Sequence, residues 1–188
     1  MKTGQFVCLL FCLGYVSAQV FKFGSCPNVP VQSDFDLDRY YGTWYEFERY
    51  FFIAESLLKC SSATYSSKPD GTIQVVNSGV NFITGRDSSV TGTASVDPKF
   101  NNTAKLTVGF GGFSNGPYWV LKTDYDQYVI VFSCTNILFG RAHTEIMWIL
   151  TRERTGITEE MKNDLHRYIR QVGLDPSKLS PTQQTNCS

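Results

Sequence analysis

The sequence predicts an all-β protein, an eight-stranded antiparallel up-and-down β-barrel with one C-terminal α-helix packed on its outside. Two observations predict this fold. Short β-type runs alternate with turn residues from about residue 41 to residue 152, and one amphipathic helical pattern follows them. Consecutive antiparallel strands in this number close most simply into a barrel, because closure removes exposed strand edges. A β-sandwich is the competing arrangement.

The predicted strands follow one another without an intervening helix. Pro69-Asp70-Gly71 indicates a hairpin turn, and Asp97-Pro98 ends another strand. The eight predicted strands are Gly42–Tyr50, Cys60–Ser66, Thr72–Ser78, Ser88–Val96, Ala104–Phe110, Tyr118–Thr123, Tyr128–Cys134 and Thr144–Arg152.

The predicted helix has a clear beginning and end. Thr158 is a plausible N-cap, and Gly173 ends the periodic pattern. An apolar stripe runs along one helix face: Met161, Leu165, Tyr168, Ile169 and Val172. Such a helix needs an apolar patch on the outside of the barrel, and strand alternation assigns that patch to Tyr45 and Phe47.

The N-terminal residues read as a secretory signal peptide. The basic Lys2 precedes an apolar run over residues 6–16, and Val16-Ser17-Ala18 supplies the small residues of a cleavage site. We therefore expect residues 1–18 to be removed, residues 19–188 to form a single domain, and the protein to be secreted and extracellular. No later apolar stretch is long enough to predict a transmembrane segment.

The cysteines fit export. Of six cysteines, Cys8 and Cys12 fall in the predicted signal peptide, and the remaining four predict two disulfides with three possible pairings: Cys26, Cys60, Cys134 and Cys187. They form no C-x-x-C pair, so we expect no zinc site or other metal site. Asn101 begins a glycosylation signal in a polar turn, whereas a second match at Asn186 is discounted because it abuts a cysteine and the chain end.

The composition favours binding a ligand over transforming one. Seventeen basic and seventeen acidic residues leave no net charge, which argues against a nucleic-acid partner. The sequence contains no nucleophile elbow, phosphate-binding glycine loop or metal-binding helix motif, so we expect no enzyme activity and no catalytic residues. His143 and His166 are expected to be ordinary surface residues.

Three short motifs carry a resemblance that covers essentially the whole mature chain. Gly42-Thr43-Trp44 opens the first predicted strand, Thr123-Asp124-Tyr125 lies between the sixth and seventh, and Arg152 ends the eighth. In this order they resemble the conserved regions of the lipocalins, most closely the branch of apolipoprotein D and the insect bilin-binding proteins. The motif residues are Gly42, Trp44, Thr123, Asp124, Tyr125 and Arg152.

The resemblance implies structural roles for several residues. It pairs Cys26 with Cys134 and Cys60 with Cys187. It also places the Arg152 guanidinium over the Trp44 ring, a cation–π contact that closes one end of the barrel.

The resemblance also implies a ligand cavity. Tyr65, Asn77 and Trp148 correspond to residues of the cavity wall, and strand alternation from these anchors adds Ala63, Val75, Thr144, Ile146, Tyr118 and Val120. Two alternatives remain open: Ile73 for Val75, and Trp119 with Leu121 for Tyr118 with Val120. Glu46 and Glu48 share the Trp44 face, but a bulge that returns Glu48 to solvent is the favoured interpretation.

The implied function is a secreted carrier of one small hydrophobic molecule, with a non-covalently bound bilin such as biliverdin as the leading ligand. Fatty acid or another lipid, sterol, retinoid and carotenoid are alternative ligands. An isomerase of the prostaglandin synthase type, which needs a free cysteine, and a protein-interaction module are alternative functions. The apolar loops 50–59 and 135–143 could serve as a lid, in self-association or in lipid contact.

Overall fold

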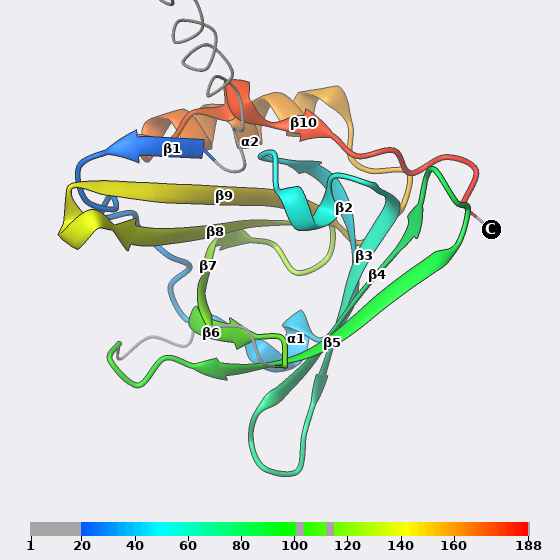
Figure 1. Ribbon diagram of the computed structural model, residues 1–188, viewed down its shortest axis with the longest axis horizontal. Helices are drawn as coiled ribbons and strands as arrows, with labels where there is room; N and C mark the ends of the chain where they lie inside the picture. The colour runs from blue at the N-terminus through cyan, green and yellow to red at the C-terminus, as the bar shows by residue number, and fades with distance from the viewer. Residues whose placement is uncertain (1–19, 101–103, 112–114, 188) are drawn as a thin grey trace, which may run out of the picture.

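A computed structural model describes residues 20–100, 104–111 and 115–187, and eight consecutive antiparallel strands form its barrel (Figure 1). Each strand pairs with the next, and a pairing between the last and the first closes the sheet. The predicted fold class is therefore confirmed. The barrel strands are β2 (Gly42–Arg49), β3 (Leu58–Ser67), β4 (Ile73–Asn81), β5 (Asp87–Val96), β6 (Lys105–Gly109), β7 (Gly116–Thr123), β8 (Tyr128–Ile137) and β9 (Ala142–Thr151).

Short elements that the sequence patterns do not predict extend the sheet at both chain ends. β1 (Val20–Phe23) pairs with the start of β9, and β10 (Ser180–Pro181) pairs with the end of β2 (Figure 1). Strands this short contain too few residues to show a period of two. The remaining short elements are α1 (Leu37–Tyr40), η1 (Ile53–Glu55), η2 (Leu138–Gly140) and η3 (Pro176–Lys178).

Helix α2 (Glu159–Gln171) packs on the outside of the barrel, as predicted (Figure 1). The Thr158 hydroxyl caps it by accepting from the Met161 amide at 3.2 Å. Its buried Leu165 and Ile169 join an outer core cluster that includes Phe47, whereas Tyr45 lies under the Arg154 guanidinium at 4.4 Å. Of the two residues predicted to lie beneath the helix, Phe47 thus packs in the cluster with α2, and Tyr45 packs against Arg154.

A β-bulge in β2 decides where Glu48 points. The register between β2 and β9 shifts between Glu46 and Glu48, so the two side chains leave on different faces. Glu48 is only 3% exposed and binds Lys162 at 3.2 Å and His166 at 2.6 Å, both on α2. The bulge was expected, but two expectations were wrong: Glu48 lies buried under the helix and not in solvent, and His166 is not an ordinary surface residue.

His143 is also buried, contrary to expectation. It is 4% exposed, its Nδ1 lies 2.8 Å from the Gly24 carbonyl oxygen, and its Nε2 lies 3.1 Å from a Glu145 carboxylate oxygen. The reason is β1, which pairs alongside this part of β9 and whose Lys22 contacts Glu145 at 2.8 Å. Because the sequence patterns do not predict β1, they leave His143 at an unpaired strand edge.

Arg152 closes one end of the barrel. Its guanidinium carbon lies 3.7 Å from the centroid of the fully buried Trp44 ring. The same group donates to the backbone carbonyls of Tyr125 at 2.9 Å, Thr43 at 3.1 Å and Arg39 at 2.8 Å. It thus joins three separate segments of the chain to the barrel floor.

The other motif residues shape the chain around this floor. Gly42 has φ +100°, and a Cβ added there would lie 3.2 Å from Arg152 Nη1, so both conformation and space favour glycine. The Asp124 carboxylate accepts from the amides of Gln127 at 2.8 Å and Tyr128 at 3.0 Å. It thereby holds the turn between β7 and β8.

Two disulfides fasten the chain ends to the barrel. Cys26 is bonded to Cys134 and Cys60 to Cys187, the pairing that the resemblance implies. The predicted signal peptide, residues 1–18, and the predicted glycosylation site at Asn101 lie outside the described residues. Within the described ranges, no helix is both long and apolar enough to cross a membrane.

Replacing Arg152 by Ala is expected to lower the free energy of unfolding by about 3 kcal/mol, because three backbone carbonyls lose their donor and Trp44 loses its cation. Urea denaturation of the purified protein measures the loss. The control is Arg167→Ala on α2, where an exposed pair with Asp164 predicts a change below about 0.5 kcal/mol. Equal losses in the two variants would contradict the assigned role.

Replacing both Cys60 and Cys187 by Ala is expected to cost about 4 kcal/mol of stability, because their disulfide closes a loop with a sequence separation of 127. The Cys26–Cys134 pair, with a separation of 108, should cost nearly the same when it is removed. Thermal or urea unfolding under non-reducing conditions measures both losses. A loss below about 1 kcal/mol for either pair would show that the chain-entropy estimate fails here.

A candidate ligand-binding cavity

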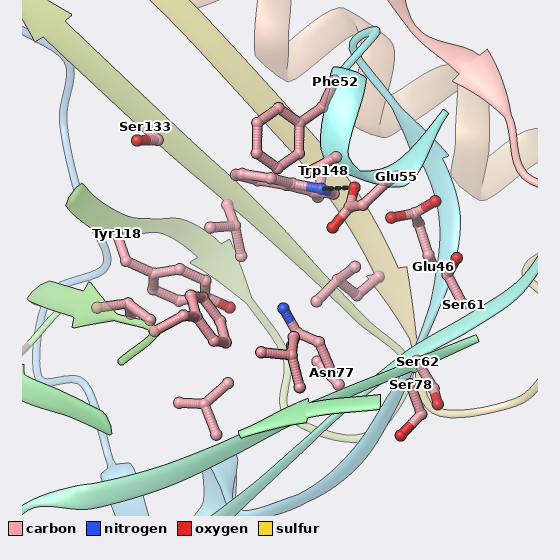
Figure 2. Close-up of a pocket in the computed structure, with 18 of the residues that line it drawn as sticks. Glu46, Phe52, Glu55, Ser61, Ser62, Asn77, Ser78, Tyr118, Ser133 and Trp148 are labelled. Atoms are coloured by element: carbon pink, nitrogen blue, oxygen red, sulfur yellow. Dashed lines mark hydrogen bonds between the residues drawn. The ribbon is translucent and has the colours of Figure 1, made fainter. Parts of the chain in front are cut away.

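The barrel encloses a cavity of about 530 Å³ (Figure 2). Apolar side chains from β4, β5, β6, β8 and β9 form much of its wall, among them Val75, Val90, Val108, Val131 and Leu150. Polar groups interrupt the wall at several separate points rather than at one end (Figure 2). These polar residues are Glu46, Glu55, Ser61, Ser62, Tyr65, Asn77, Ser78, Ser88, Tyr118 and Ser133.

Six of the nine predicted wall residues line the cavity: Ala63, Tyr65, Val75, Asn77, Tyr118 and Trp148. Val120 points into the barrel but lies deeper, fully buried in a core cluster with Tyr40 and Trp44. Thr144 and Ile146 precede Trp148 on β9, close to the start of the strand where β1 pairs, and neither lines the described cavity. These three positions share a strand face with cavity-lining residues but do not line the cavity themselves.

The structure distinguishes the alternative wall residues on β7 by strand phase and those on β4 by depth. Tyr118 lines the cavity, whereas Trp119 and Leu121 pack into the outer cluster beneath α2. On β4, Val75 lines the cavity, and Ile73 is buried with the floor residues. Both alternatives that strand alternation left open are thus resolved in the structure.

The segment between β2 and β3, with the first residue of β3, contributes wall residues that the sequence prediction missed. Phe52, Ala54, Glu55 and Leu58 line the cavity, and the Phe52 ring packs edge-on against Trp148 with centroids 6.3 Å apart (Figure 2). Only the apolar composition of loop 50–59 indicated that it could cover the mouth. Its other apolar residues, Phe51, Ile53 and Leu57, remain exposed.

Three tyrosine hydroxyls meet next to the floor. The Tyr118 hydroxyl lies 2.7 Å from that of Tyr40 and 2.7 Å from that of Tyr65. Burial raises the pKa of Tyr65 to about 12 and raises the pKa values of Tyr40 and Tyr118 well above the ordinary range. These groups are therefore neutral phenols at physiological pH, able both to donate and to accept hydrogen bonds.

Two carboxyl groups lie near one guanidinium at the other side of the cavity. Arg49 donates to the Glu46 carboxylate, which also accepts from the Thr182 hydroxyl. Glu55 accepts from Trp148 Nε1 at 3.2 Å, and its carboxyl oxygen lies 3.8 Å from Arg49 Nε. Burial, assisted by repulsion from Glu46, raises the pKa of Glu55 to about 8, so this group is mostly protonated at pH 7.

The cavity is better equipped to hold an organic molecule than a metal ion. Among the described residues, no group of three or more His, Cys, Asp or Glu side chains could hold a metal. The wall combines aromatic and aliphatic surface with a few fixed polar groups, which is the usual character of a small-molecule site.

Comparisons with known proteins agree with this arrangement. The chain is 39% identical to apolipoprotein D of Cavia porcellus over 179 residues, which cover 90% of this chain and 87% of that protein. It is 31% identical to the bilin-binding protein of Pieris brassicae over 169 residues, 88% of this chain and 86% of that protein. Insecticyanin from the tobacco hornworm Manduca sexta superposes with a TM-score of 0.75 at 28% identity, covering 88% of this chain and 89% of that one.

A family model described as a lipocalin-like domain matches residues 35–184. That range spans the floor motifs, all eight barrel strands and α2. With the closed barrel, the internal cavity and these relatives, it shows that the chain belongs to the lipocalin family, the carriers of small hydrophobic ligands.

Proposed function

We propose that this lipocalin is a secreted carrier that binds one small hydrophobic molecule in its barrel cavity, and that this molecule is a bilin such as biliverdin. The observation that carries the proposal is the cavity of about 530 Å³ with an apolar wall and polar groups at several separate points. The two disulfides and the predicted signal peptide support secretion.

The spread of the polar groups favours a bilin. Asn77, Tyr118 and the Glu55–Trp148 pair face the cavity from different sides (Figure 2). A bilin is an open chain of four pyrrole-type rings, with nitrogen and oxygen groups distributed along its length. It can therefore meet several of these polar groups at once, whereas a ligand with one polar end would leave most of them without a partner. The bilin-binding relative supports the same ligand class.

A lipid is the second candidate ligand. Val90, Val108, Val131 and Leu150 give the wall an aliphatic surface, and the chain is 39% identical to a protein named apolipoprotein D. Fatty acids, sterols, retinoids and carotenoids would all bury apolar surface against this wall.

The other candidate functions have less support. An isomerase with a catalytic thiol needs a free cysteine in the cavity, but the four cysteines in the described ranges are all disulfide-bonded. The exposed residues of loops 50–59 and 135–143 provide surface for self-association or lipid contact. They include Phe51, Ile53, Leu57, Leu138 and Phe139.

Titration of the purified, ligand-free protein with biliverdin is expected to give one saturable site. Bound pigment should show a shifted absorption band and induced circular dichroism, because the barrel fixes one twisted conformation of the chromophore. Oleate and retinol serve as comparison ligands. Saturable binding of these lipids without biliverdin binding would replace the bilin by a lipid.

Replacing Trp148 by Phe is expected to weaken biliverdin binding about fivefold, or about 1 kcal/mol, because the smaller ring buries less ligand surface and Glu55 loses its donor. The matched control is Trp119→Phe, since Trp119 packs on the outer face of the barrel. Pigment absorption, which does not depend on tryptophan fluorescence, measures the biliverdin affinity of both variants. Equal weakening in both would count against ligand contact at Trp148.

A further inference from the structure

The charges around Glu55 are unbalanced. Arg49 directs Nη1 to the Glu46 carboxylate and the Thr182 hydroxyl, and Nη2 to the Glu55 backbone carbonyl at 2.8 Å. Its Nε remains 3.8 Å from the Glu55 carboxyl, beyond hydrogen-bonding distance. The guanidinium therefore compensates mainly Glu46. The Glu55 carboxyl accepts from the neutral indole N–H of Trp148 and, when protonated, can donate to the Glu46 carboxylate.

This carboxyl lies in a corner of the cavity that also has aromatic walls. Phe52 and Trp148 are nearly perpendicular, at 88°, and both line the cavity beside Glu55 (Figure 2). Trp148 turns its N–H edge toward Glu55. A carboxylate in such an aromatic-lined corner suits a cation, because the attraction between opposite charges is stronger where the walls exclude water. An anionic ligand group at the same place would meet both Glu46 and Glu55.

We propose that this corner, formed by Phe52, Glu55 and Trp148, is a subsite for a positively charged or N–H-donating nitrogen group of the ligand, with the Glu55 carboxylate as the acceptor. The proposal rests on the proposed function only in that the cavity must admit a hydrophobic ligand. It does not require that ligand to be a bilin, although the pyrrole nitrogens of a bilin would satisfy it.

The subsite predicts that binding is linked to a proton. The titratable and charged groups that face Glu55 are Glu46 and Arg49 on β2 and Tyr65 on β3. Because burial raises the pKa of Glu55 to about 8, the carboxyl must lose its proton to bind an ammonium group at pH 7. The affinity for a cationic ligand should therefore rise with pH, by up to about tenfold per unit, and become constant above about pH 8.

Dodecylamine and dodecanol, used below their micelle concentrations, test the subsite because they differ only in the head group. Isothermal titration calorimetry at pH 8 is expected to show the wild-type mature protein binding dodecylammonium at least tenfold more tightly than dodecanol. At pH 7, titrations in buffers of different ionisation enthalpy should show release of nearly one proton per dodecylammonium bound. Glu55→Gln should abolish both the preference and the proton release.

The control variant is Glu153→Gln, which removes one carboxylate from an exposed position after β9. It should retain the preference and the proton release. Equal binding of amine and alcohol by the wild type would overturn the subsite and leave the carrier function intact. A preference that persists in Glu55→Gln would overturn the assignment to Glu55. Failure of both probes and of biliverdin to bind would overturn the subsite and the carrier function together.

Discussion

The contact between Arg152 and Trp44 is the constraint on which the rest of the barrel depends. An eight-stranded barrel that keeps a cavity leaves part of its interior unpacked. The residues at its closed end must therefore supply a larger part of the stabilising contacts. Here one guanidinium covers a buried indole ring and satisfies carbonyls from α1, β2 and the turn after β7. Above this floor, Tyr40, Tyr65 and Tyr118 form a second layer, and the open volume begins only beyond them.

Much of the fold could be predicted because its signals are local. Alternating side chains, hairpin turns and the helix cap at Thr158 each depend on a few neighbouring residues. The same alternation, anchored at Tyr65, Asn77 and Trp148, assigns Ala63 and Tyr118 to the inner face of the barrel, and both line the cavity. Alternation assigns a side chain to a face of the sheet but does not show whether it borders open volume, and Val120, Thr144 and Ile146 share that face without lining the cavity.

The remaining differences arise from contacts between segments far apart in the sequence. The bulge after Glu46 turns Glu48 toward α2, and β1 covers His143, so two polar residues are buried by distant elements. Glu55 belongs to a loop whose path depends on Arg49, which binds its backbone carbonyl. No periodic pattern records such pairings, because they depend on tertiary geometry rather than on local propensity.

The disulfide between Cys60 and Cys187 has a consequence beyond mechanical attachment of the tail. It holds the segment in which Thr182 donates to the Glu46 carboxylate and Gln184 donates to the backbone carbonyls of Glu46 at 2.9 Å and Ser61 at 2.7 Å. Thr182 and Gln184 therefore help set the electrostatic potential inside the cavity, although they lie outside the barrel. Reduction of this disulfide would thus alter the charge distribution around Glu46 from a distance, before any strand of the barrel is disturbed.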